Sequence, residues 1–371
     1  MERSSESRVV DSATTDLLTA AAQQSLERRV AGIVGTSKPS ARPGPLADGQ
    51  VGVHERQAAT EERLAADVLA HRDWLRGEGE GYSGGETSLT VDRVVREGDI
   101  ITLDADEVTS LAYEKINGDE PPTTAYTAQH SFVFQRSPRG LWELAEDRQL
   151  EPTGLLPLHQ ASSLVYLDTA ITADMIGEPP EGPAQVKAPS ANDEAASVER
   201  GPESRDEKDE LGLRAYNYGA MATYLERYWK NYNRAYRSYN NVGGDCTNFA
   251  SQALRAGGWA HDLGWYRSSE NWWYNRLNET WSWINVNYWA SFAYRYSRRV
   301  RSLSNVWQMG RGDVLQVDGN RNNSKDHTMM CSYRSSSGTP YLTYHTTNRY
   351  RRSMTLVLRD WGNALYYAGR T

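Results

Sequence analysis

The stretch GGDCTNFASQAL, residues 243–254, contains Cys246, one of two cysteines in the chain. Asp245 is a residue type that caps helix N-termini, and apolar residues recur at helical spacing until the Gly257–Gly258 pair. We therefore predict a helix of about three turns that begins at Cys246. Unpaired N–H groups and the helix dipole favour a thiolate at such a position. Cys246 is thus a candidate nucleophile, against the alternative of an ordinary buried cysteine.

The chain of 371 residues changes composition at Gly212. Residues 1–212 carry a net charge of −19, whereas residues 213–371 carry +12 and contain 10 of the 12 Trp and 18 of the 22 Tyr. The length is sufficient for two domains with separate cores. The opposite charges also suggest an intramolecular contact in which the acidic half restrains the basic half.

Hydrophobic patterns divide the chain into four predicted segments. Residues 1–54 are predicted to form a helical or flexible N-terminal segment. Residues 55–171 are predicted to form an α+β domain of unknown role, since a helix-like stretch precedes alternating strands; it resembles the cone-shaped domains of the nuclear-transport-factor-two superfamily. Residues 172–210 are rich in Pro, Glu, Ala and Ser, which predicts an acidic disordered linker. Residues 211–371 form the second predicted domain.

Strand-like segments that contain histidine follow the cysteine helix. DHTMMCSYR, residues 326–334, places His327 near the start of one strand, and YLTYHTT, residues 341–347, places His345 in the next. A cysteine hydrolase requires an imidazole within hydrogen-bond reach of the sulfur, where it takes and returns the thiol proton. The order of these segments therefore predicts hydrolysis through a Cys–His pair.

Five motifs, namely DCTNFASQAL, SWIN, RGDVLQ, DHTMM and YHTTN, occur in this order and together resemble the putative amidase domain family of Gram-positive bacteria. That family is grouped with papain-like cysteine peptidases, beside the CHAP amidases and related cell-wall endopeptidases. The resemblance covers residues 211–371 and implies an α+β fold in which the helix of Cys246 packs on an antiparallel sheet that carries His327. It also implies that Cys246 is the nucleophile, that His327 is the general base and that no cofactor is needed.

Related cell-wall enzymes place a third catalytic residue on the strand after the base. His345 occupies that position here, and a hydrogen bond from it would orient the ring of His327. Asn348 and Asp326 are alternatives, and His345 is equally consistent with a structural histidine. The identity of the third residue therefore stays open between these interpretations.

Two further groups are expected to contact the substrate. The N–H of Cys246 and the side chain of Asn241, or of Asn240, are candidates to hold the oxyanion. The aromatic segment 259–289 contains large amphipathic rings that can stack on sugar or peptide planes, although most of these rings are equally consistent with core packing. The candidate substrate-binding rings are Trp272, Trp273 and Trp283.

A disulfide between Cys246 and Cys331 is the competing interpretation of the two cysteines. In a strand that begins near His327, Cys331 lies ~13 Å farther along. The Cα atoms of bridged cysteines stand only ~5–6 Å apart. A sulfur that contacts His327 would not reach Cys331, so the dyad is preferred and Cys331 is predicted to be a buried structural thiol.

The expected substrate is a peptide or cell-wall polymer, and the basic second half favours an anionic one. A catalytically silent papain-like binding module for wall glycan or a partner protein, and a thiol acyltransferase, are the alternative functions. The sequence contains no metal-ligand spacing, no nucleic-acid-binding motif and no apolar stretch near the ~20 residues of a membrane span. The opening residues lack the apolar core of a secretory signal, so placement at the cell surface rests on the resemblance alone.

Overall fold

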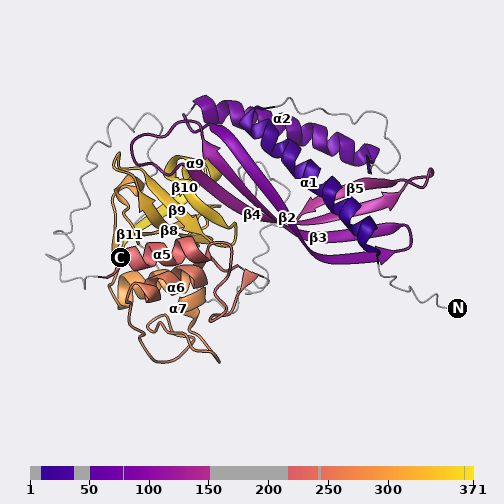
Figure 1. The fold of residues 1–371 in the computed structure, drawn as a ribbon. Helices are drawn as coiled ribbons and strands as arrows, with labels where there is room; N and C mark the ends of the chain where they lie inside the picture. Colours follow the sequence, from indigo (N-terminus) through magenta and orange to yellow (C-terminus); the bar gives the residue numbers. More distant parts are fainter. Residues whose placement is uncertain (1–9, 37–50, 78, 151–215, 241–243, 363) are drawn as a thin grey trace. The chain divides into compact units, whose positions relative to one another are not determined.

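The computed structural model describes residues 10–36, 51–77, 79–150, 216–240, 244–362 and 364–371 (Figure 1). The chain divides into two compact units of mixed α and β structure. The first comprises residues 1–116 and 122–164, and the second comprises residues 117–121 and 165–371. The predicted linker, residues 172–210, lies outside the described residues.

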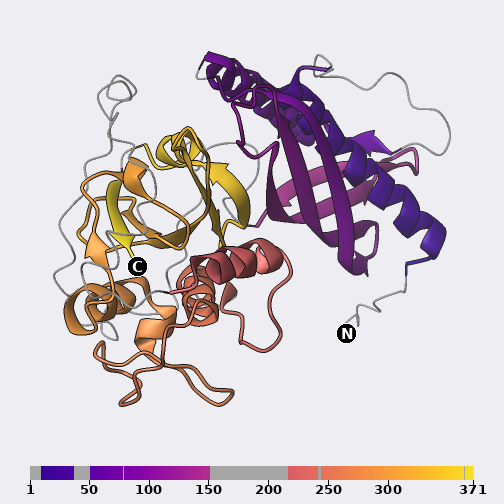
Figure 2. The ribbon, with the colours of Figure 1, turned by 60° about the vertical axis from the view of Figure 1, so that its left-hand side comes forward.

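The first unit is an antiparallel sheet covered on one face by two helices, as Figures 1 and 2 show. The strand order is β1-β5-β4-β3-β2, with only the short β1 parallel to its neighbour. Helix α1 packs within this unit together with α2, whereas the sequence assigned it to a separate N-terminal segment. The elements are α1 (Ser12–Val34), β1 (Gly52–Val53), α2 (Glu55–Gly77), β2 (Tyr82–Glu97), β3 (Ile100–Tyr113), β4 (Thr123–Arg136) and β5 (Trp142–Gln149).

The core of the first unit follows from the two periodicities of its elements. Side chains of β3 alternate between buried and half-buried along almost the whole strand, as expected for a sheet with one covered face. Helix α1 buries Leu18, Ala22 and Leu26, spaced by four, against this face. Phe132 and Phe134 of β4 complete the same cluster.

The second unit contains a six-stranded antiparallel sheet with the order β10-β9-β8-β7-β11-β6. Its helices are α5 (Tyr218–Tyr228), α6 (Cys246–Ala256), α7 (Trp281–Ile284), α8 (Val286–Ala290) and α9 (Met354–Asp360), with a π-helix, η4 (Ser291–Tyr296), and a 3-10 turn, η5 (Val306–Gln308). Its strands are β6 (Arg301–Ser302), β7 (Val314–Asp318), β8 (His327–Arg334), β9 (Pro340–Tyr344), β10 (Arg349–Ser353) and β11 (Leu365–Arg370).

Helices α5 and α6 pack against each other and against strand β8. Helix α6 begins at Cys246, as the sequence predicts, and its apolar residues Phe249, Ala250, Ala253 and Leu254 are buried. Among the described residues, no helix is long and apolar enough to cross a bilayer.

Candidate functional site: the start of helix α6

The N-terminus of α6 is closed by a threonine hydroxyl. The N–H groups of Asp245 and Cys246 both donate to Oγ1 of Thr346, at 2.8 and 3.1 Å. Gly244 precedes them with φ +104°, and a Cβ at this position would lie 2.9 Å from the same oxygen. Glycine is therefore required for this approach. The N–H of Cys246, expected at the oxyanion, is engaged in this conformation.

Asp245 stands at the N-cap of α6 but makes no side-chain capping bond to the helix backbone. Its Oδ1 accepts instead from the N–H of Tyr239 and from Nδ2 of Asn248, both at 2.8 Å. Its Oδ2 lies 2.7 Å from Nδ1 of His345. The carboxylate therefore joins the approach segment to α6 and to the end of β9.

The sulfur of Cys246 has hydroxyl and N–H neighbours. The residue is partly exposed, and its Sγ lies 3.8 Å from Oγ1 of Thr247. Burial raises the pKa of the Cys246 thiol, while hydrogen bonds from the N–H of Thr328 and from Thr247 act in the opposite direction. The net rise differs from the sequence argument, because removal of water outweighs the effect of the helix terminus.

The strand register places His327 on the sheet face opposite to α6. Thr328 pairs with Gln316, and Oγ1 of Thr328 bonds to Oγ1 of Thr247 on α6 at 2.9 Å. Side chains alternate between faces along a strand. His327, which precedes Thr328 and pairs with Val317, therefore points away from α6. The structure does not bring Cys246 and His327 together, contrary to the expectation of an assembled pair.

The ring of His327 lies in an aromatic environment. It stacks on Trp361 at 5.7 Å between centroids and meets the edge of Tyr344 at 5.2 Å. Its Nε2 is buried and has no hydrogen-bond partner among the described residues. Burial lowers the pKa of His327 to about 3, so the imidazole is neutral near pH 7.

His345 lies on the α6 face but is held by other partners than His327. Its ring stacks on Phe249 at 3.6 Å and on Tyr232 at 4.0 Å between centroids. Nδ1 lies 2.7 Å from the Asp245 carboxylate, and Nε2 donates to the carbonyl oxygen of Tyr228 at 2.8 Å. Both ring nitrogens are therefore occupied, and the predicted hydrogen bond from His345 to His327 is not formed.

The remaining polar candidates have separate partners. Asn348 accepts from the hydroxyl of Tyr232 at 3.1 Å, and Asp326 accepts from the N–H of Gly319 at 2.6 Å. Nδ2 of Asn240 donates to the Tyr232 hydroxyl at 2.6 Å. Asn241, predicted for the oxyanion, lies outside the described residues.

Two of the three candidate substrate-binding rings belong to the core. Trp272 and Trp283 are fully buried, and their indole N–H groups donate to Ser251 Oγ and Asn248 Oδ1 at 3.1 and 2.8 Å. The prediction that these two line a substrate groove is therefore wrong for this conformation, because no part of either ring reaches the surface. Trp273 is partly exposed and donates to the carbonyl of Gly264 at 3.0 Å.

The cysteines are not bridged. Neither forms a disulfide, and Cys331 is buried with its Sγ 3.1 Å from the carbonyl oxygen of Tyr333. Cys331 pairs with Leu342 on the sheet face that also carries His327. The disulfide interpretation is therefore wrong, and Cys331 is a buried thiol as expected.

The site contains three side chains that the sequence interpretation did not select, namely Thr247, Thr328 and Gln316. They form a hydrogen-bonded series beside the sulfur. Thr247 follows the cysteine and Thr328 follows the histidine, so alternation along DHTMM was a usable signal that Thr328 and His327 face opposite ways. Nothing in the sequence shows which face receives α6.

The first unit contains a buried ionic cluster. Nδ1 and Nε2 of His130 lie 2.8 Å from Asp147 Oδ1 and 3.0 Å from Glu107 Oε2, and Arg29 pairs with Asp147. The hydroxyl of Tyr126 donates to Glu107 at 2.9 Å. These partners raise the pKa of His130 to about 9 against the effect of burial. Each charged side chain of the cluster has a hydrogen-bonding partner of opposite charge, so we interpret the cluster as a stabilising structural element.

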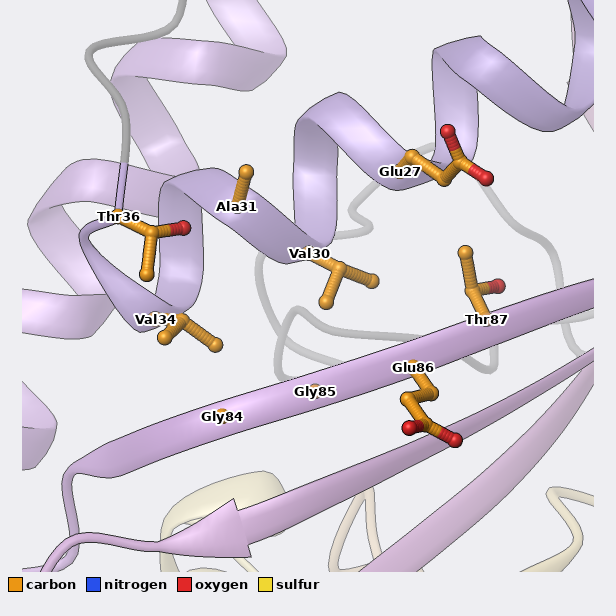
Figure 3. A pocket seen from close by; sticks show the side chains of 9 residues that line it. All are labelled: Glu27, Val30, Ala31, Val34, Thr36, Gly84, Gly85, Glu86 and Thr87. Atoms are coloured by element: carbon orange, nitrogen blue, oxygen red, sulfur yellow. The ribbon is translucent and has the colours of Figure 1, made fainter.

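Figure 3 shows an open hollow of about 560 Å³ between α1 and β2 of the first unit. Gly85 borders it, and a Cβ there would lie 2.7 Å from Val30 Cγ1, so a glycine allows α1 to approach the strand. No cysteine, serine or histidine side chain lines it, and no group of three metal-ligating side chains occurs in the described part of the chain. The lining residues are Glu27, Val30, Ala31, Val34, Thr36, Gly84, Gly85, Glu86 and Thr87.

Two solved structures are similar to part of this chain. They are the Kfla4162 protein from Kribbella flavida, with TM-score 0.24, 16% identity and coverage of 37% of this chain and 90% of that one, and a nuclear transport factor 2 (NTF2-like) superfamily protein from Salmonella enterica, with TM-score 0.22, 13% identity and coverage of 38% and 94%. Likenesses at these TM-scores carry no conclusion about the fold or function of this chain.

Sequence comparison concerns 44% of the chain or less. The proteins named uncharacterized protein YhbB and uncharacterized protein YjcM, both from Bacillus subtilis (strain 168), are each 27% identical to this chain, over 172 and 163 residues. The matches cover 44% and 42% of this chain but only 53% and 36% of those relatives. The segment 215–368 matches the model of the putative amidase domain. The resemblance of the second domain to the putative amidase domain family is thus confirmed over residues 215–368.

Proposed function

We propose that the second unit hydrolyses amide bonds with Cys246 as the nucleophile. The match to the putative amidase domain family supports the class of bond. The observation that carries the role of the cysteine is the position of its sulfur. Cys246 is the partly exposed first residue of α6, and its sulfur has the N–H of Thr328 and the hydroxyl of Thr247 as neighbours.

The reaction has two stages. The Cys246 thiolate attacks the amide carbonyl, the S–C bond forms, and the C–N bond breaks as the amine leaves with a proton from a general acid. Water then attacks the thioester, the S–C bond breaks, and a carboxylic acid is released with the free thiol. The oxyanion of each tetrahedral intermediate requires N–H donors, and the Cys246 N–H is freed for this when Thr346 moves aside.

The general base in this proposal is His327, although its ring packs on the opposite sheet face in the described conformation. It directly precedes Thr328, whose N–H reaches the sulfur. Catalysis requires a rearrangement at the first residue of β8 that carries the ring to the α6 face. Nε2 of the ring has no hydrogen-bond partner among the described residues, so the movement of this atom breaks no hydrogen bond, while the ring loses its packing on Trp361 and Tyr344.

The proposed substrates are peptide bonds or peptide-to-sugar links of bacterial cell wall. The net charge of +12 over residues 213–371 favours an anionic polymer, and the attraction weakens with added salt. Trp265, which is 64% exposed, and the partly exposed Trp273 are available for stacking on sugar or peptide planes.

The test is release of new amino groups from purified peptidoglycan by the full chain. We expect release by the wild type and by Cys331→Ala, because the Cys331 side chain lies on the sheet face opposite to α6, and none above background by Cys246→Ala. His327→Ala is expected to lose at least a hundredfold in rate. Full activity of Cys246→Ala would contradict the nucleophile, and full activity of His327→Ala would contradict the base alone.

A binding module is the second candidate, and the separation of both histidines from the sulfur favours it. In that case Cys246→Ala pelleting with peptidoglycan would equal that of the wild type, and neither would release amino groups. An acyltransferase would instead show faster loss of substrate when a small amine is added as acceptor, because both reactions share the acyl-enzyme.

A further inference from the structure

Four polar side chains lie in series between α6 and the sheet. Nε2 of Gln316 is 3.4 Å from Oγ1 of Thr328, which is 2.9 Å from Oγ1 of Thr247, which is 3.8 Å from Sγ of Cys246. Gln316, Thr247 and Thr328 are at most 1% exposed, whereas Cys246 is partly exposed. The series thus runs from the protein interior to the reactive sulfur.

The hydrogen bonds at the Gln316 end of this series have a fixed direction. Nε2 of Gln316 also donates to the carbonyl oxygen of Val286 at 2.9 Å, and a carbonyl only accepts, so this atom is the amide nitrogen. Its second hydrogen is directed at Thr328 Oγ1. When the O–H of Thr328 donates to Thr247 Oγ1, the hydroxyl hydrogen of Thr247 is left to point at the sulfur. This is the arrangement on which the proposal rests.

We propose that Gln316, Thr328 and Thr247 are positioning residues whose directed hydrogen bonds deliver an O–H donor to Cys246 and stabilise its thiolate. A series in which every donor faces the sulfur favours negative charge there, since hydrogen bonds to an ionised acceptor are the stronger ones. The Thr328 N–H acts on the sulfur in the same sense. These donors offset part of the rise in the thiol pKa that burial causes, and they do so without an adjacent imidazole, which the described conformation lacks.

The charged groups near the sulfur do not supply this stabilisation. Asp245, next to it on α6, disfavours a second negative charge and is itself paired with His345. His327 is neutral and lies on the other sheet face. The ammonium group of Lys325 lies over the ring of Tyr367 at 4.2 Å, in a different part of the sheet.

The inference rests on the proposed role of Cys246 as nucleophile. Its test measures the ionisation of the Cys246 thiol and does not depend on enzymatic turnover. The rate of iodoacetamide labelling of Cys246 is measured against pH on the full chain with Cys331→Ala as background. Thr247→Val keeps the side-chain shape and removes the hydroxyl. We expect its labelling pKa to rise by about one, which slows labelling about tenfold below that pKa. Thr247→Ser retains the hydroxyl and is expected to follow the parent.

Two further variants keep the test decisive if Thr247→Val does not fold. Thr328→Val and Gln316→Leu remove earlier members of the series and are expected to shift the profile in the same direction by less. Ser332→Ala, which removes a buried hydroxyl paired with Thr343 at 2.7 Å, is the matched control and leaves the profile unchanged.

Profiles of folded Thr247→Val, or of Thr328→Val and Gln316→Leu, that coincide with the parent would overturn the inference. Absence of labelling of the parent at any pH up to 10 would also overturn it. Inactivity on peptidoglycan with a normal labelling profile would instead reject the hydrolase and leave the hydrogen-bonded series in place.

Discussion

Two buried histidines of this chain have opposite charge states. His130 of the first unit lies between two carboxylates, and its pKa is raised to about 9. His327 of the second unit has rings of Trp361 and Tyr344 as neighbours, and its pKa is lowered to about 3. Burial acts in the same direction on both, so the difference comes from the partners alone. The charge state of a buried histidine therefore cannot be inferred from burial alone and depends on the groups that contact its ring.

The difference between the partners of His130 and those of His327 distinguishes a structural cluster in the first unit from a candidate reactive site in the second. The first unit pairs each of Arg29, Asp147, His130 and Glu107, so its cluster has no vacant donor or acceptor for a substrate on the histidine ring. In the second unit, Nε2 of His327 has no hydrogen-bond partner within the part of the chain that the structure describes. Unpaired buried polar atoms are costly and often mark function.

The largest expected effect comes from breaking the paired cluster. Asp147→Ala leaves Arg29 and His130 buried without their shared carboxylate, and we expect it to lower the free energy of unfolding by about 3–5 kcal/mol. The measurement is chemical denaturation of the full chain followed by circular dichroism. The control Glu146→Ala breaks the exposed pair with Arg148 and should cost less than about 1 kcal/mol. Equal losses in the two variants would show that the cluster is not a stabilising unit.

The two buried histidines should make the stability of their units depend on pH in opposite directions. His130 binds its proton more tightly in the folded state, so its contribution to stability is complete below pH 6.5 and is lost as the pH rises towards about 9. His327 binds its proton less tightly in the folded state, so its contribution is complete above pH 6.5 and is lost as the pH falls towards about 3. The contribution is of the order of 3 kcal/mol for His130 and of the order of 5 kcal/mol for His327.

Thermal unfolding between pH 4 and pH 9 measures this contrast. We expect the first unit to weaken on the alkaline side of pH 6.5 and the second on the acidic side. A first-unit transition that is equally stable at pH 6 and pH 9 would contradict the charged state of His130.

A smaller effect is expected from His327→Leu. The substitution removes a buried unpaired nitrogen and keeps an apolar side chain beside Trp361, so the free energy of unfolding at pH 7 should change by less than about 1.5 kcal/mol. The acid-side loss of stability in the second unit should become shallower. His345→Leu is the contrasting variant. It removes the partner of Asp245 Oδ2, so it should lower the free energy of unfolding by more than His327→Leu does. A larger loss from His327→Leu than from His345→Leu would contradict these environments.

Local signals in the sequence predicted the start of α6 and the strand with His327, whereas His345, expected in the next strand, lies in the turn directly after β9. The helix begins at Cys246 as the glycine and aspartate before it predicted, although Thr346 and not Asp245 accepts from the first N–H groups, and the buried apolar spacing continues to Leu254. Alternation also placed His327 and Cys331 on a common face, as the register shows. These features depend on residues close together in the chain.

The side-chain partners depend on tertiary packing and were not predictable in the same way. Which sheet face receives α6 is set by contacts such as Thr247 with Thr328, 81 residues apart. His345 finds Asp245 from 100 residues away. Trp283 is buried because Asn248 supplies an acceptor for its indole inside the core. The spacing of residues along the chain does not predict such contacts between distant side chains.

The most direct test of the account is trapping of an acyl-enzyme. The full chain is mixed with soluble peptidoglycan fragments, quenched in acid within the first turnovers, and mapped by mass spectrometry. The account predicts a fragment-derived mass on the peptide that contains Cys246, absent from Cys331 and absent in Cys246→Ala. Amino-group release by the wild type with no such adduct, and at an equal rate by Cys246→Ala, would contradict it.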